Sequence, residues 1–178
     1  GYSSSTAPET NNVLWNYTTG SDIYSSPAVV DNRIYITSSD DNVYCLNSST
    51  GEFIWSFSSA YDLSESSIAV CDDKAFVGSM HNLYCLNSSS GSHIWNKSGI
   101  WPDSCSPTIA DDKLYIGETN RGKLYCLDVN TGSEIWNYSM EMSSNLYSVP
   151  SYYGGYIYIG SPEGNIYCLN AATGNHIW

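Results

Sequence analysis

Tryptophan recurs along this chain at a nearly constant interval. Trp15, Trp55, Trp95, Trp136 and Trp178 are separated by 40, 40, 41 and 42 residues. Two other residue types keep the same period, at Cys45, Cys85, Cys126 and Cys168 and at Gly51, Gly91, Gly132 and Gly174. Self-similarity at a fixed period of about 41 residues is the signature of a repeat architecture. The repeat therefore constrains the fold more strongly than any single motif.

Each copy contains four short stretches rich in β-branched and aromatic residues, with no 3.6-residue apolar stripe. We expect first strands at 25–30, 66–71, 105–110 and 148–153, and second strands at 33–36, 74–77, 113–116 and 156–159. Third strands are expected at 43–46, 83–86, 124–127 and 166–169, and fourth strands around 53–55, 94–95, 135–136 and 177–178. Two-residue turns of Asp, Asn or Gly, at 31–32, 72–73, 111–112 and 154–155, join the first two strands of each copy.

A repeated four-stranded antiparallel unit of this length predicts an all-β protein, a β-propeller of about four blades. The predicted blades are residues 25–55, 66–95, 105–136 and 148–178. Residues 13–19 are expected to form an extra outer strand, and residues 1–12 a tail or linker.

Composition excludes several classes of protein. Eighteen Asp and Glu against six Lys and Arg give a net charge of −12, which argues against nucleic-acid binding. Sixteen Tyr and six Trp supply enough apolar area to argue against disorder. No apolar run approaches the roughly 18 residues of a spanning helix, so membrane insertion is not expected. The chain starts at Gly1 without a visible signal peptide, which we interpret as a processed or excised chain.

The segment Cys45-Leu-Asn-Ser-Ser-Thr-Gly-Glu-Phe-Ile-Trp55 resembles the tryptophan-docking motif, Ala-x-Asp-x-x-Thr-Gly-x-x-x-Trp, of the PQQ-type (quinoprotein-like) propeller repeats. It recurs as 85–95, 126–136 and 168–178. The resemblance implies that each Trp packs across the gap between neighbouring blades and that the Thr-Gly turn places it. The structural residues it implies are Trp15, Trp55, Trp95, Trp136, Trp178, Gly51, Gly91, Gly132, Gly174, Thr50, Thr131 and Thr173.

This chain departs from the motif at three positions. The Ala is Cys in every copy, and the Asp survives only as Asp128, with Asn47, Asn87 and Asn170 elsewhere. Ser90 replaces the Thr of the second copy. Buried Cys is small and apolar, and Asn makes the same turn hydrogen bonds as Asp, so these changes should preserve the motif.

The resembled family includes quinone-dependent dehydrogenases and propellers that bind no cofactor, such as scaffold proteins of bacterial outer-membrane assembly. The family's enzymes stack the quinone on a disulfide between adjacent cysteines and bind calcium, generally in eight blades. This chain has no Cys-Cys pair and four recognisable blades. We therefore expect no catalytic, cofactor-binding or metal-binding residues, with a portion of a PQQ-dependent dehydrogenase as the alternative.

The cysteines, histidines and paired acids have structural interpretations. Four cysteines share one strand position in successive blades, too far apart to bridge, so reduced buried thiols are expected. His93 and His176 share a repeat position with Phe53 and Glu134, which indicates a solvent-facing site. The Asp pairs at 72–73 and 111–112 fit hairpin turns better than a calcium loop.

Five Asn-x-Ser/Thr sequons occur, at Asn16, Asn47, Asn87, Asn96 and Asn137. Their number alone is weak evidence for glycosylation. The acidic, lysine-poor and Ser/Asn-rich composition nevertheless suits an extracellular or cell-surface protein.

The connections between blades, residues 56–65, 96–104 and 137–147, share no common pattern. Variable loops on a constant scaffold are where binding sites occur. These loops carry the candidate partner-binding residues Tyr61, Trp101, Met140, Met142 and Tyr147. The alternative interpretation is that these side chains plug the end of the central channel.

Four blades would form half of an eight-bladed ring and leave two open edges, which proteins ordinarily cover. Three arrangements follow: a fragment of a longer propeller, a four-plus-four homodimer, or a filament built through blade edges. The hypothesis is a non-catalytic interaction or structural module that binds a protein partner or itself. A carbohydrate-binding surface module is the third alternative.

Overall fold

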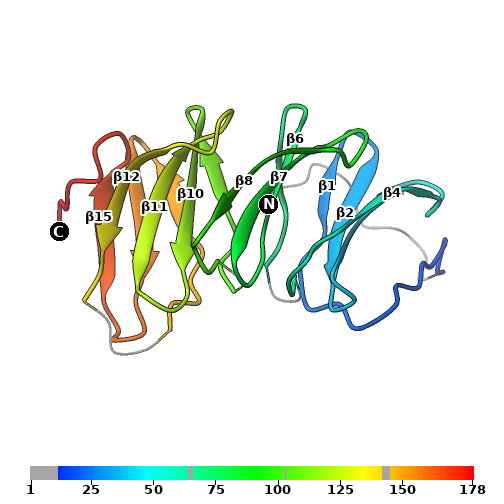
Figure 1. Cartoon of the computed structure of the whole chain (residues 1–178), viewed down its shortest axis with the longest axis horizontal. Coiled ribbons are helices and arrows are strands. Elements are labelled where there is room, and N and C mark those ends of the chain that lie inside the picture. Colours follow the sequence, from blue (N-terminus) through cyan, green and yellow to red (C-terminus); the bar gives the residue numbers. More distant parts are fainter. Residues whose placement is uncertain (1–11, 64–65, 103, 142–144) are drawn as a thin grey trace.

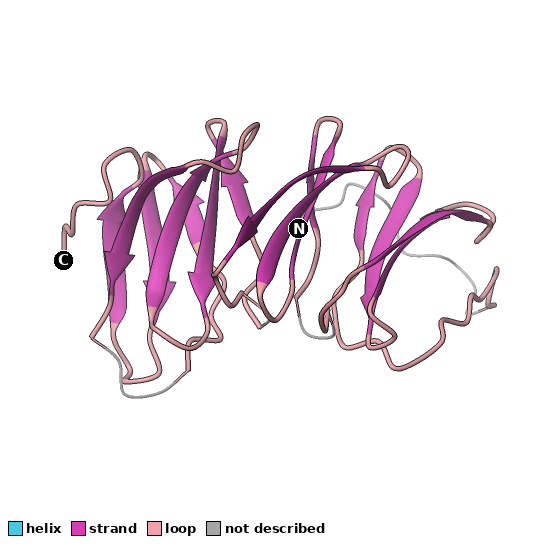
Figure 2. Ribbon diagram, in the orientation of Figure 1, coloured by secondary structure: helices cyan, strands magenta, loops and turns pink. Residues whose placement is uncertain are grey.

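The computed structural model describes residues 12–63, 66–102, 104–141 and 145–178. These residues form fifteen strands and no helix (Figure 2). Accordingly, the described part of the chain has no helix long and apolar enough to cross a membrane.

The strands form four antiparallel sheets, one per repeat. The first contains β1 (Ala28–Val30), β2 (Arg33–Ser38), β3 (Asn42–Asn47) and β4 (Phe53–Ser58), and the second β5 (Ala69–Cys71), β6 (Lys74–Gly78), β7 (Asn82–Asn87) and β8 (His93–Ser98). The third contains β9 (Thr108–Ala110), β10 (Lys113–Glu118), β11 (Lys123–Asp128) and β12 (Glu134–Ser139), and the fourth β13 (Ser151–Tyr153), β14 (Tyr156–Gly160) and β15 (Ile166–Asn170). Within each sheet the strands pair in chain order, which confirms the predicted all-β propeller blades.

Tight turns join the first two strands of each blade as the residue types predict. Asp31 and Asn32, and likewise Asp111 and Asp112, have positive φ between 48° and 59°. Asn and Asp tolerate this left-handed region better than most side chains, and it matches the twist of a hairpin. The acid pairs at 72–73 and 111–112 therefore lie in turns, although in the second blade only Asp72 has positive φ.

Two of the expected strands differ from the observed ones. Residues 13–19 form no strand, because no described strand lies beside them to pair with their backbone. The fourth strand of the last blade is reduced to a bridge between Leu169 and His176, with hydrogen bonds between Cys168 and residues 177 and 178. The inner strands are also shorter than expected. In three blades a proline, Pro27, Pro107 or Pro150, precedes the strand and lacks the N–H that a strand ladder needs, whereas Ile68 precedes the equally short β5.

The four sheets follow one another in chain order along the molecule, with the first and last at opposite ends (Figure 1). The inner strands β1, β5, β9 and β13 lie beside one another, and no contact joins the first and fourth sheets among the described strands. Hydrogen bonds connect the start of neighbouring inner strands, from Ser26 N–H to Ser67 Oγ (3.0 Å) and from Ser67 N–H to Ser106 Oγ (2.9 Å). The described blades thus form an open arc.

The hydrophobic core lies between the blades. One cluster joins the first and second blades around Tyr35, Val43, Trp55 and Leu86, and another joins the second, third and fourth around Phe76, Tyr115 and Trp136. Burial of apolar faces between neighbouring sheets is therefore what holds the repeats together.

Candidate interaction surfaces

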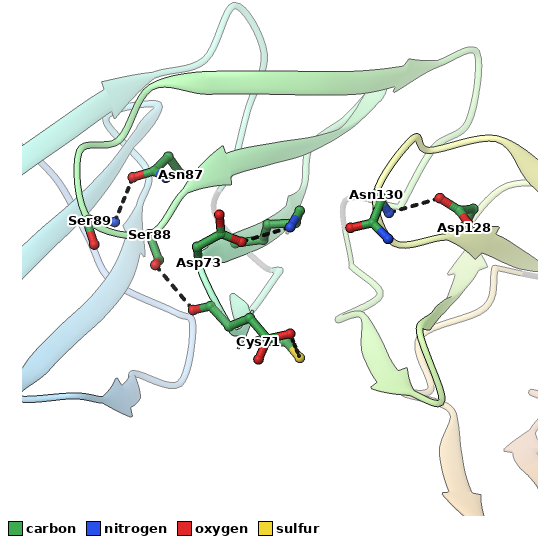
Figure 3. A network of polar contacts seen from close by, with 9 residues as sticks. Cys71, Asp73, Asn87, Ser88, Ser89, Asp128 and Asn130 are labelled. Atoms are coloured by element: carbon green, nitrogen blue, oxygen red, sulfur yellow. Dashed lines mark hydrogen bonds and ion pairs between the residues drawn. The ribbon is translucent and has the colours of Figure 1, made fainter.

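Each docking motif forms a side-chain turn at the end of the third strand. Asn47 Oδ1 accepts hydrogen bonds from the N–H groups of Ser49 (2.8 Å) and Thr50 (3.0 Å). Asn87, Asp128 and Asn170 accept the two equivalent bonds in their own turns. Figure 3 shows Asn87 bonded to Ser89 and Asp128 bonded to Asn130 at corresponding turns of two neighbouring blades. Asn thus replaces the Asp of the motif without loss of the turn.

The glycine of each turn carries the tryptophan ring of the preceding repeat. A Cβ atom built on Gly51, Gly91, Gly132 or Gly174 would lie only 2.6–2.7 Å from the ring of Trp15, Trp55, Trp95 or Trp136, respectively. The same glycines have φ between 69° and 73°, a region that L side chains rarely adopt. Glycine is therefore required at these positions for two reasons. The backbone has a positive φ, and the tryptophan ring leaves no room for a Cβ atom.

Hydrogen bonds fix three of the four docked rings. The Nε1–H groups of Trp15, Trp55 and Trp136 donate to the carbonyl oxygens of Ser48, Ser88 and Ala171, at 3.0–3.1 Å. The hydroxyls of Tyr35 and Tyr115 donate to two of the same carbonyls, those of Ser88 and Ala171. Trp95 differs: its buried Nε1 has no hydrogen-bond partner, and its neighbouring ring is Phe76, which has no hydroxyl.

The fifth docking residue, Trp178, has no glycine to pack on among the described residues. Its ring lies 6.2 Å from that of Tyr158, close to the 5.8–5.9 Å between the docked Trp rings and their partners Tyr35, Phe76 and Tyr115. Trp178 is nevertheless 60% exposed, whereas Trp55 is 6% exposed. The ring of Trp178 thus lies beside Tyr158 as the docked rings lie beside their partners, but no described blade packs on it.

The first blade has an apolar face that no other described blade covers. A shallow apolar groove of about 240 Å³ lies on it, lined by Trp15, Tyr17, Thr19, Ile23, Pro27, Val29, Ile34, Ile36 and Leu46. Val29 is 62% exposed in this groove. Apolar surface of this kind is what neighbouring blades bury against each other inside the chain.

A row of aromatic and cationic side chains crosses three blades on their loops. Tyr61 meets His81 edge to face with 4.7 Å between ring centroids, and His81 lies 6.0 Å from Trp101 in a similar arrangement. The guanidinium carbon of Arg121 lies 4.3 Å from the Trp101 ring centre, within cation–π range. Tyr61 and Trp101 come from blade connections, and His81 and Arg121 come from the β6–β7 and β10–β11 loops. We call these four residues the aromatic row.

A buried carboxylate supports the end of the aromatic row. Glu118 is completely buried, accepts a hydrogen bond from the Tyr125 hydroxyl (3.0 Å) and lies 3.8 Å from Arg121 Nε. Burial, and then the Glu118 charge, raise the pKa of Tyr125 to about 12, so this hydroxyl remains the donor at neutral pH. The Glu118 carboxylate thus lies beside the Arg121 guanidinium, which stands over the Trp101 ring.

Two observations on the aromatic row bear on the kind of ligand that it could bind. Sugars stack on open aromatic faces, and Arg121 covers one face of Trp101. Tyr61 remains 41% exposed and the neighbouring Met80 43% exposed. Exposed Tyr, Met and Arg are the residue types that protein interfaces favour.

The structure places the other candidate loop residues apart from this row. Met140 is 5% exposed and packs in the core of the third and fourth blades, so the expectation that it contacts a partner is wrong for this residue. Met142 lies outside the described residues. Tyr147 is 62% exposed and lines a separate hollow of about 350 Å³ with Asn145, Ser148, Gly160, Ser161 and Pro162. Sequence reasoning missed His81 and Arg121, because the contacts that align them with Trp101 join different blades.

The six cysteines all lie in the described part of the chain, where no disulfide joins them, and five of them are buried. Burial raises the pKa of Cys45 and Cys126 to about 11 and that of Cys85 to about 12. These thiols stay protonated at neutral pH and serve as small core side chains. Cys71 is half-buried beside Asp72, and burial followed by the Asp72 charge raises its pKa too (Figure 3).

The donor set that the quinone enzymes use does not match this chain. Within the described ranges, no three His, Cys, Asp or Glu side chains lie close enough together to hold a metal ion. No two cysteines are adjacent in the sequence to form the disulfide platform. The residues that the structure describes therefore do not by themselves fit a PQQ–calcium site.

Asp128 gives the third blade a pH-sensitive docking turn. Hydrogen bonds from the Thr131 hydroxyl and N–H, followed by that of Asn130, hold the pKa of Asp128 below its ordinary value. A lowered folded-state pKa stabilises the fold above the unfolded pKa, near 3.9, and this contribution is lost as pH falls through the folded value. In Asp128→Asn the amide keeps the acceptor but does not titrate. As the pH is lowered from about 5 to about 2, we expect the melting temperature of the wild type to decrease relative to that of Asp128→Asn. Circular dichroism measures both melting temperatures. A constant difference over this range would contradict the assignment.

Comparison with known proteins gives a family match. The model of the family described as outer membrane protein assembly factor BamB matches residues 5–178. No curated protein sequence matches the chain.

Solved structures share the fold at low sequence identity. BamB from Moraxella catarrhalis superposes with a TM-score of 0.75 at 16% identity, over 94% of this chain and 67% of that one. A europium-containing methanol dehydrogenase gives a TM-score of 0.77 at 15% identity, over 93% of this chain and 44% of that one. The computationally designed Ika4 protein gives 0.76 at 12% identity, over 90% of this chain and 99% of that one. The chain therefore spans only part of the natural proteins that it resembles, and the likeness to all three concerns the fold.

Proposed function

We propose, from the premise that this chain belongs to the family of outer membrane protein assembly factor BamB, that it is a non-catalytic propeller module that binds protein outside the cytoplasm. Its partner is proposed to be another blade of the same kind, supplied by a second copy of the chain. The observation that carries the proposal is that no described residue covers the apolar groove of the first blade or packs a docking glycine on the ring of Trp178.

The two end faces correspond by repeat position to the two sides of an internal blade interface. The last blade offers Trp178, and the first blade offers the apolar groove around Val29 and Ile34. Trp15 occupies the docking place on Gly51, so it must leave this glycine if Trp178 of a second copy is to dock there. Between internal blades the same two surfaces are buried against each other, with Trp55 only 6% exposed. Because the blades are repeats, the two end faces should be complementary to each other as neighbouring blades inside the chain are. This favours head-to-tail contact between copies.

The outer strands add a second element of complementarity. Residues 13–18 are the repeat equivalents of β4, and Trp15 already docks on Gly51, yet these residues have no strand beside them. β15, the equivalent of β3, has an outer partner only at a bridge near Leu169. When two copies meet, residues 16–18 of one can continue the outer strand that Trp178 of the other begins. Unpaired sheet edges are completed in this way in strand-addition complexes.

Two other functions receive less support. A quinone-dependent dehydrogenase needs a donor set that the described residues do not provide. A carbohydrate-binding module needs open aromatic faces, and Trp101 is covered by Arg121. The envelope location follows the description of the family and suits the net charge of −12.

The test is the solution mass of the 19.6 kDa chain, measured by light scattering after gel filtration over a concentration series. We expect species of twice this mass or larger. Val29→Glu places a charge in the exposed groove and should return the protein to monomer, raising the dissociation constant at least about tenfold, because an unpaired charge is costly to bury.

Ile94→Glu is the matched control, since Ile94 is 41% exposed on outer strand β8 and lies on no end face. This variant should assemble as the wild type does. A wild-type chain that stays monomeric at all concentrations would overturn the proposal, as would equal assembly of the two variants.

A further inference from the structure

Three of the five sequons share one position of the repeat. Asn16, Asn96 and Asn137 each follow a docking tryptophan directly. Asn96 lies in β8 opposite Tyr84, and Asn137 lies in β12 opposite Tyr125, on the outermost strands of their blades. Asn16 follows Trp15, whose ring packs on Gly51 as Trp95 packs on Gly132. The outer rim of the arc therefore carries the same sequon three times.

These three sequons are accessible in the folded protein. Asn16, Asn96 and Asn137 are exposed, and so are the residues that bear the sequon hydroxyls, Thr18, Ser98 and Ser139. Single side-chain hydrogen bonds hold the amide nitrogens of two of them, from Asn96 Nδ2 to Asn82 Oδ1 (3.4 Å) and from Asn137 Nδ2 to Glu134 Oε1 (2.7 Å). Water can replace such exposed bonds at little cost.

The other two sequons lie in a different environment. Asn47 and Asn87 are half-buried, and their Oδ1 atoms each accept two backbone hydrogen bonds in the docking turn. The next residues, Ser48 and Ser88, receive the indole N–H of Trp15 and Trp55. A bulky group at either Asn would crowd a docked ring.

We infer that Asn16, Asn96 and Asn137 are N-glycan acceptors, an inference that rests on the proposed location outside the cytoplasm. The co-reactant is a lipid-linked oligosaccharide with a diphosphate or phosphate leaving group. A bond forms between Asn Nδ2 and C1 of the first sugar, and the bond from C1 to the phosphate oxygen breaks. The lipid phosphate leaves with the electron pair, and the proton lost from Nδ2 goes to it. The Asn-x-Ser/Thr sequence supplies the acceptor amide and the hydroxyl that this transfer needs.

Glycans at these positions would protect the sheet edges. β8 and β12 are the outer edges of their sheets, with one row of backbone groups unpaired by any neighbouring strand. Exposed edges of this kind invite pairing with other chains, and proteins commonly block them. A bulky, hydrated glycan at Asn96 or Asn137, in the middle of β8 or β12, prevents such pairing at that edge.

Secretion of the whole chain from a eukaryotic host tests the inference. The protein is treated with peptide-N-glycosidase in heavy-oxygen water, and mass spectrometry then identifies each Asn converted to labelled Asp. We expect label at Asn16, Asn96 and Asn137, and little at Asn47 and Asn87. The single variants Ser98→Ala and Ser139→Ala keep the Asn and should each lose one glycan, seen as one step in mass, with an unchanged circular dichroism spectrum.

Unlabelled Asn96 and Asn137 in secreted, folded protein would overturn the inference. Equal labelling of Asn47, Asn87 and the three proposed acceptors would also overturn the inference. The position of a sequon in the fold would then not decide which Asn is glycosylated. Neither result depends on self-association, which light scattering measures separately.

Discussion

Trp136→Ala should lower the free energy of unfolding by about 3–5 kcal/mol, the cost of truncating a large buried aromatic side chain. Trp136 is 9% exposed, packs on Gly174, and lies 5.9 Å from the Tyr115 ring. Its Nε1–H also donates to the Ala171 carbonyl at 3.1 Å. The substitution leaves a cavity between the third and fourth blades and removes this hydrogen bond. Urea denaturation followed by circular dichroism measures the loss.

Trp178→Ala is the matched control for this experiment. Trp178 occupies the same repeat position but is 60% exposed and packs on no docking glycine among the described residues. We expect a change of about 0.5 kcal/mol or less, as for other surface substitutions, at concentrations where the chain is monomeric. Equal losses in the two variants would show that docking across the blade gap does not stabilise the fold.

Gly91→Ala should have the second largest effect, about 3 kcal/mol or more. A non-glycine residue at φ +72° costs about 1–3 kcal/mol by itself. The new Cβ would also lie 2.6 Å from Trp55 Cε3, so the ring must leave its place on the turn. Overpacking of this kind adds about 1–3 kcal/mol. The same denaturation experiment provides the measurement.

Gly99→Ala separates backbone strain from ring contact. Gly99 has φ +78°, nearly that of Gly91, but a Cβ there meets no atom within 4 Å. This variant should show only the strain, about 1–3 kcal/mol, without the added cost of overpacking. If it destabilises the protein as much as Gly91→Ala does, the contact with Trp55 contributes nothing.

Much of the fold could be predicted from sequence because local chemistry repeats. Asp and Asn pairs at 31–32 and 111–112 predicted tight turns, and the residues between the turns predicted strands that the structure contains. The resemblance to the tryptophan-docking motif implied that the rings pack across the blade gaps, and they lie on Gly51 and its equivalents. Each of these predictions depended on a few neighbouring residues and on their recurrence.

Other features depend on contacts that the sequence pattern does not contain. Residues 13–19 have the sequence of an outer strand, but a strand also needs a partner beside it, and none is described. Met140 looks like a loop residue, yet the packing of the third and fourth blades buries it. The alignment of His81 and Arg121 with Trp101 joins loops of different blades, so periodicity gives no signal for it.

The docking of Trp95 has a consequence for the cooperativity of unfolding. In a linear array, stability is a sum of the stabilities of the units and of nearest-neighbour coupling energies. The coupling between the second and third blades lacks both hydrogen bonds found at the equivalent Trp55 and Trp136 sites, because Trp95 Nε1 is unpartnered and Phe76 has no hydroxyl. Of the seams between described blades, this one therefore has the fewest hydrogen bonds to its docked ring, and we expect these bonds' absence to lower its protection locally. In a hydrogen-exchange experiment, the protection of the backbone amides should therefore change between residues 98 and 108.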